Sequence, residues 1–276
     1  MAKESGVFKD KYGPWALIAG ASIGLGAAFA SELAQKGLNL VLIARRPGPL
    51  ESRAVELKSK HGILVKTISV DLAAPDMLQK TAAETKDLEI GLLVYDTAYM
   101  LIGPFFGHPI EKQLRAIDVN CRCPLTLAHH FGLKMIDRKH GGIILMTSLS
   151  GMQGAPWLTS YGATKAFNIV LAEGLWYELK GKGVDVIACC AGAIETPNYI
   201  SSKPENLGAF APKPLAVEKV AHEAVAALGK QPLVIPGRAY RFSQSSLERF
   251  MSRQRRIKIM AGSTEKMYGD RLITLN

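Results

Sequence analysis

The chain is poor in the residues that mark several large protein classes. Four cysteines in 276 residues are too few for a fold built on disulfides. Two of them, Cys189 and Cys190, are adjacent within an apolar run, and we interpret them as buried thiols of a reducing compartment. The chain has no internal repeat and no low-complexity linker. With 48% hydrophobic and 21% charged residues, its composition is that of a folded globular protein.

Long apolar runs that could cross a membrane or direct export are also missing. Residues 12–31 and 141–164 carry no charge, but glycine, proline or polar residues interrupt both segments. A strand, a glycine turn and a helix explain the first segment better than a signal peptide does. We therefore expect a cytoplasmic protein.

Acidic residues are scarce near the C-terminus. Between residues 238 and 258 there are seven basic residues and a single acid, Glu248, and this segment holds six of the ten net positive charges. The basic tail, residues 237–276, could pack an apolar stripe on the body or on a neighbouring subunit, contact a membrane surface, or dock an acidic carrier-linked substrate. We favour the packed stripe, and we expect no nucleic-acid binding, because no recognised module accompanies the charge. The apolar residues of the stripe are Leu247, Phe250, Met251, Ile257 and Met260.

Short apolar runs alternate with longer amphipathic segments along most of the chain. The runs are nearly continuous, as in parallel strands that are covered on both faces. This alternation predicts an α/β protein with a doubly wound parallel sheet, Rossmann-like, forming a single domain of about seven strands with helices on both faces. The expected strands are 15–19, 39–43, 64–70, 90–94, 143–147, 184–190 and 233–235, and the expected helices are 25–35, 49–60, 75–85, 111–138, 161–180 and 217–228.

A glycine turn joins the first expected strand to the first expected helix. Its spacing, Gly20-x-x-x-Gly24-x-Gly26, lacks the common G-x-G-x-x-G arrangement. Glycines at this point let backbone N–H groups approach a pyrophosphate at the helix N-terminus. The alternative is close packing of helix on strand with no ligand.

No carboxylate follows the second expected strand, where one would bind a ribose 2′-hydroxyl. Arg45 and Arg46 stand there instead, and guanidinium groups pair well with phosphate. The sequence therefore favours NADP, with NADPH preferred over NADH. The alternative is that the two arginines form a solvated surface pair.

Tyr161 and Lys165 are spaced to lie one helical turn apart on the same face. A nearby ammonium lowers the pKa of a tyrosine, which can then exchange a proton with a carbonyl oxygen. Ser148 follows an expected strand and could hold the same oxygen. Alone, a tyrosine and a lysine at this spacing indicate only a helix face.

Taken together in this order, the glycine turn, Asn120, Ser148 and the Tyr161-x-x-x-Lys165 pair resemble the short-chain dehydrogenase/reductase family, over about residues 13–236. The resemblance implies that Tyr161 is the general acid/base, that Lys165 lowers its pKa and binds the nicotinamide ribose, that Ser148 orients the substrate, and that Asn120 holds a water in a proton relay. By the same resemblance Asp71 contacts adenine, Ser22 and Arg45 contact the 2′-phosphate, and Ile194 and Thr196 grip the carboxamide. The predicted cofactor-binding residues are Gly20, Ser22, Ile23, Gly24, Gly26, Arg45, Arg46, Asp71, Ala98, Tyr161, Lys165, Ile194 and Thr196.

Two segments depart from the family pattern. Asp96-Thr97-Ala98-Tyr99 stands where Asn-Asn-Ala-Gly is usual, and Ala191-Gly192 replaces Pro-Gly. Tyr99 puts a large side chain beside the cofactor and would line the pocket instead. We expect an apolar pocket, with ordinary core packing as the alternative for its residues, and a substrate loop over residues 196–214. The expected pocket residues are Tyr99, Met152, Trp157 and Tyr199.

Histidines and cysteines elsewhere give no metal site. His129 and His130 point in different directions on a helix, and Cys121 and Cys123 have no second pair at zinc spacing. The leading hypothesis is an NADP(H)-dependent carbonyl reductase or alcohol dehydrogenase. The alternative from another class is an NADP-binding sensor or scaffold without turnover, suggested only by the change at residues 96–99. By the resemblance we expect a homodimer or homotetramer.

Overall fold

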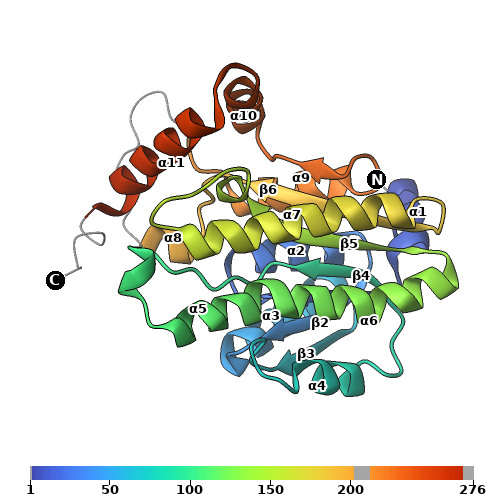
Figure 1. Cartoon of the computed structure of the whole chain (residues 1–276). Helices are drawn as coiled ribbons and strands as arrows, with labels where there is room; N and C mark the ends of the chain where they lie inside the picture. The colour runs from blue at the N-terminus through green and yellow to red at the C-terminus, as the bar shows by residue number, and fades with distance from the viewer. Residues whose placement is uncertain (1, 202–211, 270–276) are drawn as a thin grey trace.

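Short apolar segments pair into one parallel sheet (Figure 1). The computed structural model describes residues 2–201 and 212–269, and in these residues the sheet has seven strands in the order β3-β2-β1-β4-β5-β6-β7. The expected α/β class, the parallel sheet and its strand positions are thereby confirmed. The strands are β1 (Trp15–Ala19), β2 (Asn39–Ala44), β3 (Val65–Ser69), β4 (Ile90–Tyr95), β5 (Gly141–Ser148), β6 (Val184–Ala191) and β7 (Leu233–Val234).

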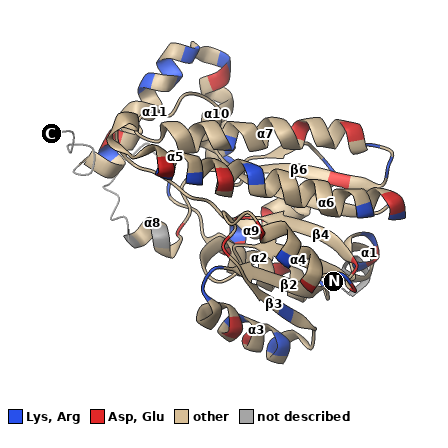
Figure 2. Ribbon diagram, turned by 60° about the horizontal axis from the view of Figure 1, so that its bottom comes forward, with Lys and Arg blue, Asp and Glu red and all other residues tan. Residues whose placement is uncertain are grey.

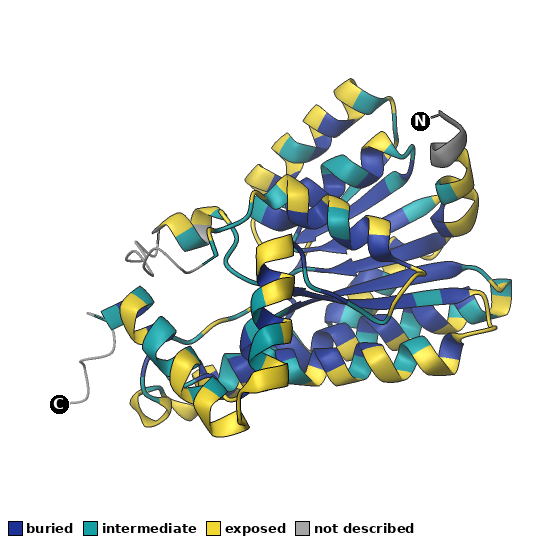
Figure 3. Ribbon diagram, turned by 90° about the horizontal axis from the view of Figure 1, so that it is seen from above, coloured by how far each residue is buried: buried dark blue, intermediate teal, exposed yellow. Residues whose placement is uncertain are grey.

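Helices cover both faces of the sheet. The α2, α3 and α9 helices pack on one face and the α4, α6 and α7 helices on the other, so the sheet lies between two helical layers (Figure 1). Figure 3 shows the strands dark blue between helices whose outer surfaces are yellow. The helices are α1 (Ala2–Tyr12), α2 (Gly24–Gln35), α3 (Pro47–His61), α4 (Met77–Glu84), α5 (Ile110–Ile117), α6 (Cys123–Arg138), α7 (Thr159–Leu179), α8 (Pro197–Ser201), α9 (Val217–Ala227), α10 (Arg238–Phe250) and α11 (Arg253–Tyr268).

Each face of the sheet has its own hydrophobic core. Successive strand residues point to opposite faces, so Ile18 packs with Phe29 of α2 in one core and Leu17 packs with Phe131 of α6 in the other. This double burial is why the strands read as continuous apolar runs. The strand order reverses between β1 and β4, and their carboxyl ends form the crevice where ligands bind in sheets of this kind.

The long helix expected over residues 111–138 is interrupted. One turn of π-helix, Asp118–Arg122, separates α5 from α6. Pro124 has no N–H and clashes with the carbonyl of the residue four positions earlier, which is Asn120. The Asn120 carbonyl instead accepts a hydrogen bond from Asn168 Nδ2 at 2.7 Å. The interruption therefore places Asn120 in a local backbone conformation that a continuous helix does not offer.

The residues before β1 also form a helix, α1, which the sequence pattern did not predict. The α1 helix packs at the amino ends of β4 and β5, and the Tyr12 hydroxyl donates to Asp185 Oδ2 at 2.5 Å. Lys11 Nζ lies 2.5 Å from the same oxygen. Burial and the Asp185 carboxylate raise the pKa of Tyr12 far above its ordinary value. These contacts tie the start of the chain to β6.

The basic tail forms two helices, α10 and α11, so the residues of the predicted apolar stripe are divided between them. Met251 is extended, and the Ser252 side chain caps α11 by accepting from the Arg255 N–H. Basic residues recur on both helices (Figure 2). Along the described chain, no helix has the length and apolar character needed to cross a bilayer. Of the expected substrate loop, residues 202–211 lie outside the described residues.

Candidate active site

The glycine turn lies at the crevice between β1 and β4. Gly20 has a φ of +102°, and a Cβ there would lie 2.8 Å from Thr97 Oγ1 in the loop after β4. A Cβ on Gly26 would lie 2.2 Å from the carbonyl oxygen of Gly20. Side chains at these positions would push the turn away from its neighbours. The turn therefore presents backbone at this edge of the sheet, as a dinucleotide-binding turn must.

The N-terminus of α2 follows directly. Ile23 is extended and forms no side-chain cap, and the first turn of α2 holds no acidic residue. Ile23 therefore offers no side-chain acceptor to the first N–H groups of this helix. The Gly26 N–H is directed at the Asp96 carboxyl, and the helix dipole favours an anion beside the other N–H groups of the first turn. Ser22 precedes Ile23 in the turn. Thr196 and Pro197 lie 3.5 Å from the Cβ position of Gly24, so the segment after β6 covers the same turn.

Two exposed arginines stand at the end of β2. Among the described residues, neither Arg45 nor Arg46 forms a salt bridge with a carboxylate. The backbone carbonyl of Arg45 accepts the Ser69 hydroxyl at 3.1 Å, which joins its loop to the end of β3. Arg45 also acts electrostatically on Asp71 and helps to lower the pKa of that carboxyl, and both exposed guanidinium groups can meet an anionic ligand.

Asp71 is held by Arg115, which no sequence motif indicated. Arg115 Nη2 donates to both Asp71 oxygens, at 3.0 and 2.8 Å, and the Ala73 N–H donates at 3.0 Å. Burial acts to raise the pKa of Asp71, but these hydrogen bonds outweigh it and hold the pKa below its ordinary value. The Arg115 guanidinium also lies 5.7 Å from the centre of the Tyr99 ring. Asp71 is therefore a fixed carboxylate at this edge.

Tyr161, Lys165 and Ser148 meet at the carboxyl end of β5. The first turns of α7 carry the tyrosine and the lysine, and Lys165 Nζ lies 5.5 Å from the centre of the Tyr161 ring. Lys165 is buried and donates to the Met146 carbonyl at 2.8 Å. Ser148 hydrogen-bonds with Tyr161 and accepts the Ser150 hydroxyl at 2.9 Å. Three of the four predicted catalytic side chains are thus brought together.

Burial decides the protonation of this cluster. It raises the pKa of Tyr161 well above its ordinary value, while the hydrogen bond with Ser148 acts in the opposite direction. The spacing of Tyr161 and Lys165 instead predicts a lowered pKa for the tyrosine. The structure differs because the Lys165 ammonium is directed at the Met146 carbonyl and the protein around the partly buried phenol removes water from it. Tyr161 is therefore protonated at neutral pH and holds its proton more tightly than a solvent-exposed tyrosine does.

Asp96 links the glycine turn electrostatically to Lys165. Burial raises the pKa of its carboxyl to about 7, and the Lys165 charge and the Gly26 N–H act against that rise. Burial also lowers the pKa of Lys165 to about 8, and the nearby Asp96 carboxylate acts to raise it. Asp96, which stands where the family usually has asparagine, thus adds a titratable carboxyl that interacts with Lys165.

Asn120 fixes the loop that contains the other departure. Its Oδ1 accepts the Tyr99 N–H at 2.7 Å, and its Nδ2 donates to the Tyr99 carbonyl at 2.8 Å and to Thr164 Oγ1 at 3.0 Å. Ala98 beside it is exposed. The Tyr99 backbone is therefore anchored on Asn120 while its ring faces Arg115, so a large residue is accommodated here. The relay role of Asn120 stays a prediction.

The segment after β6 is held by the tail. Ile194 forms a bridge with Leu215, and Tyr240 of α10 accepts the Ala193 N–H at 3.2 Å. The Tyr240 ring occupies the space beside Gly192, where a Cβ would lie 2.2 Å from it. The Ala191-Gly192 pair therefore needs its glycine, because the Tyr240 ring of the tail leaves no room for a side chain at residue 192.

Tyr161 packs on an apolar cluster that does not include the four predicted pocket residues, and their place in a substrate pocket stays a prediction. Trp157 directs its indole N–H to Glu265 of α11 at 3.1 Å, and the Tyr199 N–H donates to Thr196 Oγ1 at 3.2 Å. Met152 is partly buried after a short 3-10 turn. Within the described chain, none of these residues, nor Tyr99, belongs to the cluster around Tyr161. That cluster consists of Ile102, Ala155, Leu158, Tyr161, Met260, Met267 and Tyr268.

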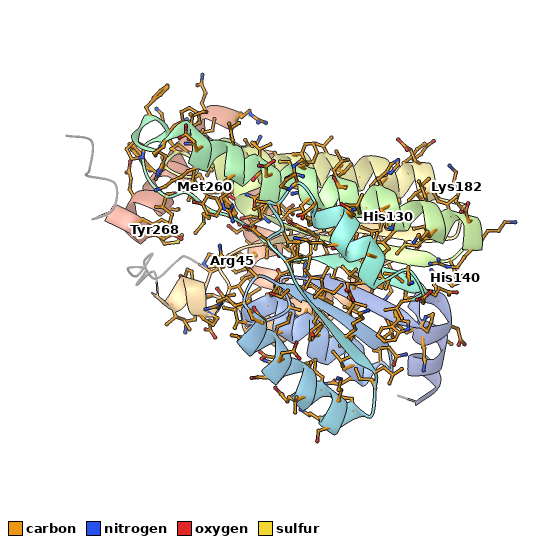
Figure 4. All side chains as sticks on the ribbon, turned by 90° about the horizontal axis from the view of Figure 1, so that it is seen from below. Arg45, His130, His140, Lys182, Met260 and Tyr268 are labelled. Atoms are coloured by element: carbon orange, nitrogen blue, oxygen red, sulfur yellow. The ribbon has the colours of Figure 1, made fainter. Side chains whose placement is uncertain are left out.

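Three residues of this cluster come from the tail, Met260, Met267 and Tyr268. The sequence pattern indicated only Met260, as part of the apolar stripe. Tyr268 follows the last residue of that stripe and belongs to no short motif, so only the folded path of α11 shows where it lies. Figure 4 places Tyr268, Met260 and Arg45 toward one end of the molecule and His140 and Lys182 at the other. The tail and the predicted phosphate-binding arginine therefore share the end at which the site is built.

Comparisons with known proteins give matches over most of the chain. A family profile described as short chain dehydrogenase matches residues 14–206. The 7beta-hydroxysteroid dehydrogenase of Collinsella aerofaciens is 32% identical over 231 residues, which are 83% of this chain and 88% of that protein. A solved structure from a study of 7beta-hydroxysteroid dehydrogenase stereoselectivity superimposes with a TM-score of 0.87 at 30% identity, over 92% of this chain and 98% of the other. A short-chain dehydrogenase from Sphingobium yanoikuyae in complex with NADPH gives 0.75 at 27% identity, over 85% and 92%.

Proposed function

The chain is an oxidoreductase that belongs to the short-chain dehydrogenase family, and we propose that it transfers hydride between NADP(H) and a bulky, apolar ketone or the corresponding secondary alcohol. The observation that carries this proposal is the meeting of Tyr161, Lys165 and Ser148 at the strand ends beside the glycine turn. A relative is named as a hydroxysteroid dehydrogenase and a structural neighbour holds NADPH. Both support this reaction and cofactor for the chain.

The residues at the strand ends fit a dinucleotide with a 2′-phosphate. The Gly20 and Gly26 positions have no room for a side chain, and the buried Thr97 Oγ1 beside Gly20 has no hydrogen-bond partner among the described residues. Gly20, Ser22, Ile23, Gly24 and Gly26 would hold the pyrophosphate, and Arg45 with Arg46 the 2′-phosphate. Asp71 and Ala98 would border the adenine side, and Ile194 and Thr196 the nicotinamide side. When bound, NADP(H) supplies or accepts the hydride.

The chain's own residues handle the proton and the substrate oxygen. Tyr161 is protonated at neutral pH, as a tyrosine with an ordinary or a raised pKa is, so it has a proton to donate to a carbonyl oxygen that gains electrons. Ser148, hydrogen-bonded with Tyr161, would hold the same oxygen and stabilise the charge that develops on it. Lys165 keeps a positive charge close to the tyrosine ring.

The exposed apolar side chains of α5, α6 and α7 support a homodimer or homotetramer. Leu114 is 57% exposed, Leu133 51%, Val170 68% and Tyr177 74%. Large apolar residues grouped on neighbouring helices mark surfaces that associate. Sedimentation equilibrium should give a mass of two or four chains, and Val170→Glu should shift it towards one. A monomeric wild-type protein would refute this part of the proposal.

Two measurements on the purified protein test the function. The first is titration with NADPH and with NADH, followed by protein fluorescence and melting temperature, because a ligand that binds the folded state raises its stability. The second is NADPH consumption with a panel of ketones from cyclohexanone to steroid ketones. We expect tighter binding of NADPH and turnover of the bulky ketones. NADPH binding without turnover on any ketone would instead favour the sensor or scaffold role.

A further inference from the structure

The turn between α10 and α11 carries apolar and basic side chains that face solvent. Phe250 is 75% exposed and Met251 is 38% exposed, and the Arg249 guanidinium lies 5.8 Å from the centre of the Phe250 ring. Arg253 and Arg255 follow in the first turn of α11, and both are exposed. We call these five residues the basic corner.

The predicted apolar stripe divides at this corner. Leu247, Ile257 and Met260 are partly buried, whereas Phe250 and Met251 are exposed. The Met251 N–H donates to the Leu247 carbonyl at 3.1 Å, so the backbone of the turn is held without either exposed side chain. Phe250 and Met251 therefore add apolar surface in solvent without adding to the core.

The outer face of α10 extends this surface. Arg238, Phe242 and Arg249 are spaced by four and seven residues, so they share one face of the helix. Phe242 is 77% exposed. Tyr240, which is buried, lies about 200° around the helix from it, because each residue turns an α-helix by about 100°. The face of α10 that is turned away from the body thus presents a phenylalanine between two arginines.

Carboxylates do not balance the charge of this surface. Glu248 accepts a hydrogen bond from Gln244 Nε2 at 2.8 Å. Figure 1 shows both helices at one edge of the molecule, outside the helices that cover the sheet, and Figure 2 shows basic residues on both. An anionic partner is therefore attracted, whereas a second copy of the same surface would be repelled. Five exposed basic side chains form no salt bridge with a described carboxylate: Arg238, Arg249, Arg253, Arg255 and Lys258.

We propose that the basic corner and the outer face of α10 dock the protein on an anionic lipid surface. The side chains of Phe242, Phe250 and Met251 enter the headgroup region, and the arginines contact lipid phosphates. A bilayer fits better than a nucleic acid or an acidic protein, because side chains that are three-quarters exposed project from the protein and need a soft apolar phase to bury them. Binding of this kind grows with the buried apolar area and with the attraction to anionic lipids. The inference does not depend on the proposed function, since none of these residues belongs to the candidate active site.

Co-sedimentation of the full chain with vesicles tests this proposal. Vesicles made of equal parts phosphatidylcholine and phosphatidylglycerol are compared with vesicles of phosphatidylcholine alone. At about 0.01 M salt the protein should sediment with the anionic vesicles and much less with the neutral ones. At about 1 M salt, where the Debye length is about 3 Å, most of the binding should be lost.

Two kinds of variant separate charge from apolar insertion. Arg253→Gln combined with Arg255→Gln should weaken partitioning about 25-fold, since each basic residue near an anionic surface contributes about fivefold. Arg253→Lys combined with Arg255→Lys keeps the charge and should keep the binding. Phe250→Ser should weaken partitioning about tenfold, because a large apolar side chain no longer leaves water. All of these side chains are exposed, so the melting temperature should stay that of the wild type.

Matched controls lie outside the tail. Lys182→Gln combined with Lys230→Gln removes the same charge from two exposed positions, and Figure 4 shows Lys182 at the end of the molecule away from Met260 and Tyr268 of α11. Val55→Ser removes an apolar side chain that is 66% exposed on α3. Both controls should sediment with anionic vesicles as the wild type does.

Three results would overturn the proposal. The first is a wild type that sediments with neither kind of vesicle, or equally with both. The second is a set of corner variants that bind anionic vesicles as well as the controls do. The third is a different occupant, seen either as binding of duplex DNA without binding of vesicles, or as a Phe250→Ser protein whose mass in sedimentation equilibrium falls while its vesicle binding is unchanged.

Discussion

Replacing Gly26 with alanine tests the glycine turn most severely. The added Cβ would lie 2.2 Å from the Gly20 carbonyl oxygen and 2.7 Å from its carbonyl carbon. Carbon and oxygen atoms approach to about 3.3 Å in comfortable contacts, so α2 or the turn must move by about 1 Å. The obstructing atoms are backbone, which cannot rotate away as a side chain can.

This displacement should lower both stability and binding. Overpacking of this kind costs about 1–3 kcal/mol, and each kcal/mol lowers the melting temperature of a protein of this size by about 2–4 °C. NADPH affinity should fall at least tenfold, which corresponds to about 1.4 kcal/mol, because the N–H groups of the turn no longer converge. Turnover should fall further, since a misplacement of about 1 Å can cost about a hundredfold.

Differential scanning fluorimetry and NADPH titration measure the two effects. Gly48→Ala is the matched control, because it lies in the first turn of α3 with no atom within 4 Å of its Cβ position. The control should keep the wild-type affinity, and its melting temperature should equal or exceed that of the wild type, because alanine favours a helix more than glycine does. A Gly26→Ala protein with wild-type melting temperature and NADPH affinity would refute the account of the turn.

Three further predictions concern single side chains. Tyr12→Phe removes the hydroxyl bound to Asp185 and should destabilise the protein by about 1–2 kcal/mol in thermal unfolding, whereas an unchanged melting temperature would show that this hydrogen bond contributes nothing. Arg45→Ala should weaken NADPH binding tenfold or more, since a charged hydrogen bond is worth about 1.5–3 kcal/mol, and leave NADH binding unchanged; equal loss for both cofactors would contradict the 2′-phosphate role. Asp96→Asn removes a carboxylate that raises the pKa of Lys165. The Lys165 pKa should therefore fall below about 8, and the alkaline limb of the pH profile of kcat should move to lower pH. A shift of that limb to higher pH would contradict the interaction between Asp96 and Lys165.

Much of the fold could be predicted because local patterns determine it. Doubly buried strands read as continuous apolar runs, and β1 begins and ends where the sequence predicts. Pro124 shows what a local reading can still overlook. Its effect on the Asn120 carbonyl follows from the sequence alone, yet a helical pattern on both sides hid the interruption. The spacing of Tyr161 and Lys165 was sufficient to place them together.

The rest depends on contacts between distant segments. Arg115 meets Asp71 only because α5 passes over the end of β3, and nothing near either residue announces the pair. Tyr268 reaches Tyr161 only because the tail turns at Met251 and folds back. The Tyr161 pKa could not be predicted either, because the direction of its shift depends on burial and on where the Lys165 ammonium points.

The most direct test of the central claim is NADPH consumption by Tyr161→Phe in the presence of a bulky ketone. Tyr177→Phe, an exposed tyrosine on the same helix, is the control. The account predicts that Tyr161→Phe binds NADPH with wild-type affinity but loses turnover by a hundredfold or more, the order of magnitude that a general acid contributes, while Tyr177→Phe keeps full activity. Wild-type turnover by Tyr161→Phe would contradict the account.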